Sequence, residues 1–277
     1  MSRQSSGSKW VAGLLVVAIV AVVGVFVYRE KQARDAAQPL PMPPAASSTA
    51  AVASTVADVP RHPIDTPAGA STAALPSLGQ SDEAVLAALL ALSGDGALKS
   101  LLRPEAIVSR MVATIDALPR HTIGMNVLPL RTPTGTFQVQ TDDGMLVESS
   151  RNFARYDTYM YVADRVSPQA AAAWYKRNYP LFQQAYRDLG TGGYFNDRLV
   201  EVIDHLLEAP ELKGALQLLP EKDGYTYANP AYEQLSAGQK FMVRVGPVNE
   251  AKLKEKLRAL REAVAGGATS VETHPVR

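Results

Sequence analysis

The hydrophobic pattern divides the chain into three parts, and the first is a run of 19 uncharged residues from Trp10 to Tyr28. At a helical rise of about 1.5 Å per residue, this run spans about 28 Å, close to the thickness of the hydrocarbon core of a bilayer. With an aromatic ring at each end, it predicts one transmembrane helix over 10–28. A cleaved signal peptide is the alternative, but its apolar run would be shorter and a small-residue cleavage site should follow it.

The second part, residues 29–76, has a different composition. Eight prolines stand among Ala, Ser and Thr between residues 36 and 76, and no aromatic residue occurs there. Such a segment buries too little apolar surface to offset the entropy of ordering, so we predict a disordered linker over 29–76. We expect His62, inside it, to have no role. Residues 266–277 are predicted to form a disordered tail.

The third part, residues 77–265, shows mainly helical periodicity and is long enough for one globular domain. Pro180 lies inside one apolar pattern that continues past it, which favours a single kinked helix over two helices. Ser81, Ser167 and Asn196 have the residue types preferred at helix N-caps. The predicted helices cover 81–92, 104–118, 167–189 and 197–208, with further helices beginning at Asn229 and Asn249.

Strand signals are fewer. Alternating or β-branched residues occur at 136–140, 123–130 and 240–245. In the last segment Phe241, Val243 and Val245 would point to one face of a strand. The sequence therefore predicts an α+β fold, a predominantly α-helical soluble domain with a small β-sheet, preceded by the transmembrane helix and the linker.

Charge and cysteine content bear on location and partners. The chain has 28 basic and 27 acidic residues, which argues against non-specific nucleic-acid binding. Arg3 and Lys9 precede the apolar run without any acid, so we expect residues 1–9 in the cytoplasm and the C-terminal domain in the periplasm. The absence of Cys fits an oxidising compartment. The predicted location is the inner membrane, crossed once by residues 10–28.

The helix predicted over 197–208 carries the most candidate chemistry. Glu201 and His205 lie one turn apart and could share a metal ion or a proton. A metal site needs three or four ligands, and the other three histidines stand alone in the sequence. We therefore predict no metal and no cofactor, and interpret this stripe as a paired polar helix face.

Aromatic residues are concentrated between 153 and 195. Their helical spacing favours a place in the core, and a groove for sugar or peptide is the alternative, with Tyr156 and Tyr186 as candidate contacts. The glycine-rich stretch 189–194 lacks the Lys-Ser/Thr pair of a phosphate-binding loop. Gly190 is better interpreted as the end of the preceding helix.

Nucleophilic catalysis finds little support, because the chain has no Cys and no G-x-S-x-G motif. An acid/base pair drawn from Asp116, Asp197, Glu201 or Asp204 stays open, since the separation of carboxylates in space is not readable from a sequence.

Four phrases resemble a proteobacterial family known as domain of unknown function 3014. They are IDALPR at 115–120, YPLFQQAYRDLG at 179–190, YFNDRLVEVIDHLLEAP at 194–210 and VRVGPVNEAKLKEKLRALR at 243–261. The resemblance implies a single-span envelope protein with a Pro/Ala-rich linker, and it implies no activity, cofactor or catalytic residue. Polar positions within these phrases form either a ligand site or a paired structural network: Asp116, Arg120, Asn196, Asp197, Arg198, Asp204, His205 and Arg244.

Two hypotheses follow. The first is a membrane-anchored periplasmic binding or scaffold module that acts on an envelope protein or peptidoglycan. The alternative is an envelope hydrolase that uses carboxylates of the 194–208 helix with Asp116. The sequence indicates no oligomeric state. The candidate binding residues are Asp116, Arg120, Tyr156, Tyr186, Asn196, Asp197, Arg198, Asp204, His205 and Arg244.

Overall fold

The computed structural model describes residues 59–64, 75–94, 96–222 and 224–265. The predicted membrane span, most of the predicted linker and the predicted tail 266–277 lie outside these ranges. Among the described residues, no helix has the length and apolar character needed to cross a membrane.

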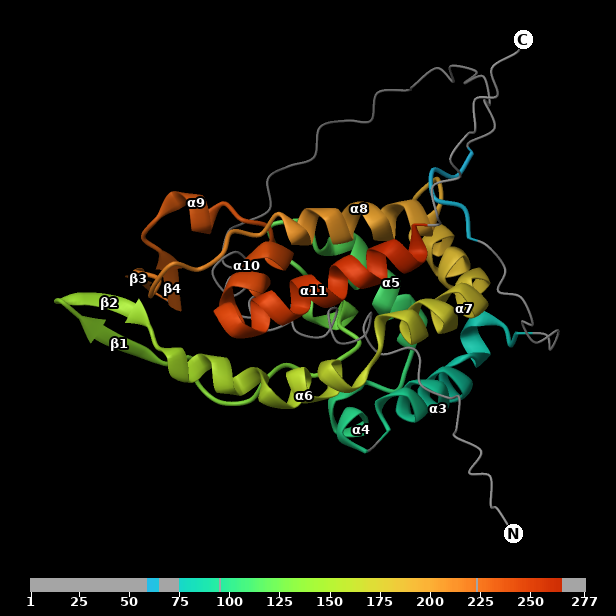
Figure 1. The fold of residues 1–277 in the computed structure, drawn as a ribbon, viewed down its shortest axis with the longest axis horizontal. Coiled ribbons are helices and arrows are strands. Elements are labelled where there is room, and N and C mark those ends of the chain that lie inside the picture. The colour runs from blue at the N-terminus through green and yellow to red at the C-terminus, as the bar shows by residue number, and fades with distance from the viewer. Residues whose placement is uncertain (1–58, 65–74, 95, 223, 266–277) are drawn as a thin grey trace, which may run out of the picture.

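The centre of the domain is a group of packed helices. α5 (Ile107–Ala117) contacts both α7 (Pro168–Asp188) and α8 (Phe195–Leu207). α11 (Pro247–Val264) packs against α7 and α8 from the other side (Figure 1). Because helices cover it on several sides, α5 is buried around most of its circumference, and its polar Asp116 is buried with the apolar residues.

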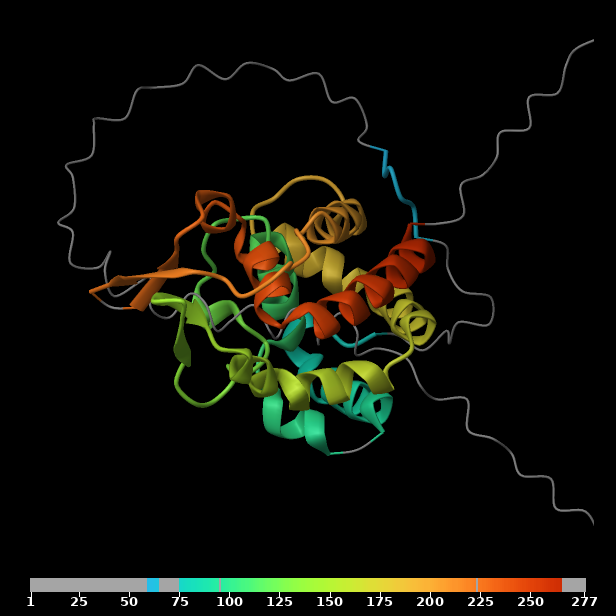
Figure 2. The same ribbon diagram turned by 60° about the vertical axis from the view of Figure 1, so that its left-hand side comes forward.

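A second group of helices covers the opposite side of this centre from α8. It comprises α3 (Asp82–Ser93), α4 (Ala97–Leu101) and α6 (Asp157–Arg165). α3 contacts α5, and α4 contacts both α3 and α6. Figures 1 and 2 both show α8 on one side of the domain and α3 with α4 on the other.

Two antiparallel hairpins occupy one end of the molecule (Figure 1). β1 (Val139–Asp142) pairs with β2 (Met145–Glu148), and β3 (Leu218–Glu221) pairs with β4 (Gly224–Tyr227). The hairpins approach each other where the Glu148 N–H donates to the Leu216 carbonyl at 2.9 Å. They enclose a small apolar cluster apart from the main core. The fold is therefore α+β, mostly helical, with two small sheets rather than one.

Several predicted helix features are confirmed. α7 continues as one helix through Pro180, and the Ser167 hydroxyl accepts from the Ala170 N–H at its start. Gly94 and Gly190 follow helix ends with positive φ angles of 70° and 78°, which glycine adopts without steric cost. Asn229 caps the short α9 (Pro230–Glu233) through its side chain.

The N-cap predicted at Asn196 is wrong. α8 begins two residues earlier than predicted, at Phe195, and Tyr194 occupies the cap position. The Asn196 side chain is buried and donates to the carbonyls of His62 and Val264 instead. Ser81 likewise makes no capping hydrogen bond, because its hydroxyl donates to Leu78.

Two of the three predicted strands are wrong. Residues 240–245 belong largely to helix α10 (Ala237–Arg244), which Ser236 and Gln239 start with a capping box. Val243 packs in the small apolar cluster at the hairpins, whereas its neighbours Met242 and Val245 pack in the main core. Because both faces of this helix are apolar, its sequence shows no single apolar stripe at helical spacing. The segment 123–130 contains a short 3-10 turn and ends in an isolated β-bridge between Leu130 and Leu102. The segment 136–140 overlaps β1 in part. The other three strands, β2, β3 and β4, have only four residues each and were not predicted.

Candidate functional site

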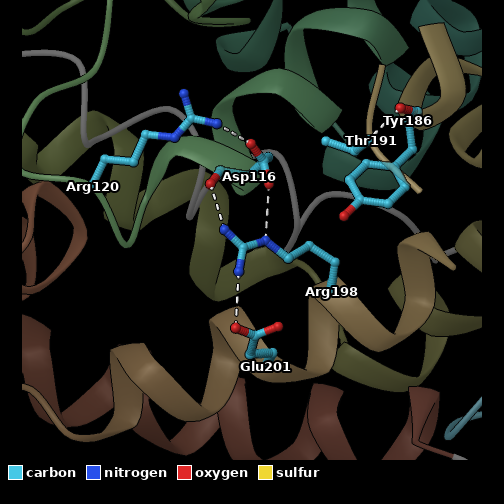
Figure 3. A network of polar contacts seen from close by, with 6 residues as sticks. All are labelled: Asp116, Arg120, Tyr186, Thr191, Arg198 and Glu201. Atoms are coloured by element: carbon cyan, nitrogen blue, oxygen red, sulfur yellow. Dashed lines mark hydrogen bonds and ion pairs between the residues drawn. The ribbon is translucent and has the colours of Figure 1, made fainter. Parts of the chain in front are cut away.

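The best-connected group of candidate residues surrounds Asp116, in the last turn of α5. Asp116 is only 5% exposed. The Arg198 guanidinium of α8 donates from Nε to Asp116 Oδ1 and from Nη2 to the Asp116 carbonyl, both at 2.9 Å. Arg120 pairs with Asp116 Oδ2 from the other side, and Glu201 accepts from Arg198 Nη1 at 2.9 Å (Figure 3).

This group, which we call the Asp116 network, has a structural consequence. Both carboxylate oxygens of Asp116 accept from guanidinium groups, so the carboxylate is held as the charged partner of two cations. The two arginines and two acids of the network balance in charge. The network therefore joins the end of α5 to α8, and both carboxylate oxygens of Asp116 are engaged in it.

Asn196 and Asp197 lie in the first turn of α8 and contact a segment that the sequence assigned to the linker. The two oxygens of Asp197 accept from the backbone N–H groups of Arg61 and His62, at 3.0 and 2.7 Å. Asn196 Nδ2 donates to the His62 carbonyl at 2.8 Å. Residues 59–64 are thus placed against the domain, and His62 contacts it through its backbone.

Asp204 and His205 point to different partners. Asp204 forms a two-point ion pair with Arg261 of α11, with Nη2 and Oδ2 at 2.9 Å. His205 Nε2 lies 2.8 Å from the Ser236 hydroxyl, and burial lowers the pKa of the imidazole. Within the described ranges, no group of three metal-ligating side chains occurs.

Arg244 and Tyr156 lie near the hairpins, away from the Asp116 network. Arg244 Nε donates to the Tyr227 hydroxyl at 2.5 Å, and its guanidinium lies 5.1 Å from the centre of that ring. Burial raises the pKa of Tyr156 to about 12. Glu148, at the end of β2, was not among the candidate residues. Its side chain is 6% exposed, and desolvation raises its pKa to about 7 against the opposing charges of Arg244 and Arg155.

Most of the aromatic residues between 153 and 195 lie in the core. Tyr175 is fully buried and its ring packs edge-on against Phe182, at 5.1 Å between centroids. Tyr186 is buried beside Phe195, at 5.5 Å. Because these rings face one another, they supply the packing of α7 on α8 rather than an exposed platform.

The candidate residues therefore fall into separate groups. Asp116, Arg120 and Arg198 meet in one network, and Asn196 with Asp197 forms a second contact. Asp204, His205 and Arg244 each bind a different element. One sequence signal could have revealed Glu148: it is a charged residue that directly follows the apolar stretch Met145–Val147, where a buried position is expected.

Glu148 predicts a measurable pH dependence of stability. The folded state retains the Glu148 proton up to about pH 7, whereas the unfolded chain loses it near the ordinary glutamate pKa of 4.5. The unfolded state then binds fewer protons, so stability falls as pH rises through this window. We expect the free energy of unfolding of Glu148→Gln to rise relative to that of the unmodified protein as pH increases. The relative gain should reach up to about 3 kcal/mol between about pH 4.5 and about pH 8.

Urea unfolding of both proteins across this range measures the difference. Titration of His205 is common to the two proteins and cancels. A stability difference that stays constant with pH would contradict the proposed origin.

Comparison with known proteins gives a family. A family model described as "Protein of unknown function (DUF3014)" matches residues 107–261, more than half of the 277-residue chain. This range contains all ten candidate residues. No curated protein and no solved structure matches the chain. The chain therefore belongs to the DUF3014 family of proteins of unknown function.

Proposed function

We propose that this protein is a membrane-anchored binding or scaffold module of the bacterial cell envelope. Residues 10–28 anchor it in the inner membrane, and the helical domain acts in the periplasm on an envelope protein or on peptidoglycan. The apolar span, the proline-rich segment after it and the nearly balanced charge of the chain support this assignment.

The observation that carries the proposal is that the candidate carboxylates form ion pairs with arginines of neighbouring helices. A hydrolase that works through paired carboxylates needs its two carboxyl groups on either side of one reacting bond. Asp116 instead pairs with Arg198, and Asp204 pairs with Arg261. Each pair joins two helices, which favours a rigid module that presents its surface over one that performs acid/base chemistry.

Crosslinking in intact envelopes tests the binding role. The full chain and a control with only residues 1–76, both carrying the same C-terminal tag, are expressed, crosslinked and purified. We expect a defined protein or glycan to be enriched by the full chain over the control. Equal recovery of all species by the two chains would refute a binding role for the domain.

A reporter fused after Arg277 tests the location separately. We expect an enzyme that matures only outside the cytoplasm to be active in this fusion, and a reporter active only in the cytoplasm to be silent. The reverse pattern would overturn the periplasmic assignment, and with it peptidoglycan as a partner.

A further inference from the structure

Residues 59–64 lie between the start of α8 and the end of α11 (Figure 1). The sequence of this segment is Val-Pro-Arg-His-Pro-Ile, and the next described range begins at Leu75, 11 positions after Ile64. Ile64 packs against the main core. The segment is therefore bound to the domain at a defined place.

The contacts engage the backbone of the segment. Asp197 Oδ2 accepts from the Arg61 N–H at 3.0 Å, and Oδ1 accepts from the His62 N–H at 2.7 Å. Asn196 Nδ2 donates to the His62 carbonyl at 2.8 Å and to the Val264 carbonyl at 2.9 Å. Hydrogen bonds to a carboxylate are about twice as strong as those between neutral groups.

The flanking prolines explain why the Arg61-His62 dipeptide is the part of the segment that Asp197 binds. Pro60 and Pro63 have no N–H, so Arg61 and His62 carry the two donors between them. A proline on each side also restricts the free segment, which reduces the entropy lost on binding. His62 Nδ1 lies 3.2 Å from the Ala265 carbonyl, so this contact requires a proton on Nδ1.

The side chains that hold the segment are buried: Asn196 is 1% exposed and Asp197 is 9% exposed. Asn196 Oδ1 is also buried and has no hydrogen-bond partner among the described residues. A buried acceptor without a partner costs free energy, so segment 59–64 does not satisfy every polar group around it.

We propose that Asn196, Asp197 and the C-terminal carbonyls of α11 form a peptide-binding site, and that residues 59–64 are its resident ligand. The ligand class is an extended peptide that presents two consecutive backbone N–H groups between prolines. This inference goes beyond the proposed function, because it depends on neither the membrane nor an envelope partner.

The site also sets the reach of the domain. In a membrane-anchored chain, docking of 59–64 leaves residues 29–58 as the spacer, about 90 Å at full extension, against about 150 Å for the whole of 29–76. A partner peptide that displaces 59–64 would lengthen the tether.

A competition experiment with the full chain tests the proposal. The probe is a fluorescein-labelled synthetic peptide of residues 57–66, and its binding is followed by fluorescence anisotropy. A full chain that lacks only residues 59–64 should bind the peptide at least about tenfold more tightly than the unmodified chain, whose own segment competes. Equal affinity for the two chains, or no binding to either, would refute the proposal.

Two controls identify the contacts. Asp197→Asn in the chain without 59–64 should weaken binding at least about tenfold, because one acceptor oxygen is replaced by a donor. The same peptide N-methylated at Arg61 and His62 lacks both donors and should not bind, a test that needs no protein variant and stays valid if Asp197→Asn impairs folding. Binding of the methylated peptide at full affinity would exclude backbone recognition by Asp197.

Discussion

Gly246→Ala is expected to lower the free energy of unfolding by about 4 kcal/mol. Gly246 joins α10 to α11 with φ 87° and ψ 158°, a backbone conformation that is essentially restricted to glycine and costs other residues about 1–3 kcal/mol. A Cβ here would also lie 2.7 Å from Cγ of Phe153, and such overpacking costs a further 1–3 kcal/mol, roughly.

Chemical denaturation of Gly246→Ala beside Gly135→Ala separates the two causes. Gly135 has a similar φ of 89°, but a Cβ there meets nothing within 4 Å. We expect this control to lose only the backbone cost, about 1–3 kcal/mol, and less than Gly246→Ala. Adding Phe153→Ala to Gly246→Ala should cost less than the sum of the two single changes, because the close contact is then absent. Equal losses for the two glycine variants would contradict this interpretation.

Lys254→Met is expected to cost about 3–5 kcal/mol, because it leaves a buried carboxylate without its partner. Lys254 Nζ lies 2.9 Å from Glu250 Oε1, and the two side chains are 6% and 2% exposed. Burial raises the pKa of Glu250, although the Lys254 ammonium opposes this. Lys254 also donates to the Ala209 carbonyl at 2.6 Å, so the same side chain holds α11 against the end of α8.

Thermal and urea unfolding of three variants measure this effect. The double variant Lys254→Met, Glu250→Leu should recover most of the loss, because no unpaired charge remains. Lys252→Met is the matched control, since Lys252 lies on the same helix as Lys254. Its ion pair with Asp164 of α6 is nearly half exposed and should contribute under about 1 kcal/mol. A loss for Lys254→Met no greater than that for Lys252→Met would show that the buried pair does not stabilise the fold.

Most of the longer helices could be predicted because their signals are local, whereas α4 and α6 were not predicted. The apolar spacing of α7 continues across Pro180, and the residues that cap or end α7 lie within one turn of its ends. The prediction failed at α10 for a tertiary reason. This helix lies between the main core and the hairpin cluster, so consecutive residues are buried and the helical stripe disappears.

The candidate residues could be selected but not grouped. Asp116 and Arg198 are 82 positions apart, and nothing in their local sequence indicates that they pair. Glu148 was missed because its raised pKa arises from burial in the folded domain, which outweighs the opposing charge of Arg244 on another element. The short hairpins were missed because strands of four residues with exposed faces carry little periodicity.

By itself, the sequence determined the family, the helical character of the domain and the apolar run from Trp10 to Tyr28, because each is a property of consecutive residues. The tertiary structure decided which charges are paired and which segment the domain holds. Asp197 meets Arg61 across 136 positions of sequence, and only the packing of α8 against α11 brings the carboxylate to that backbone N–H.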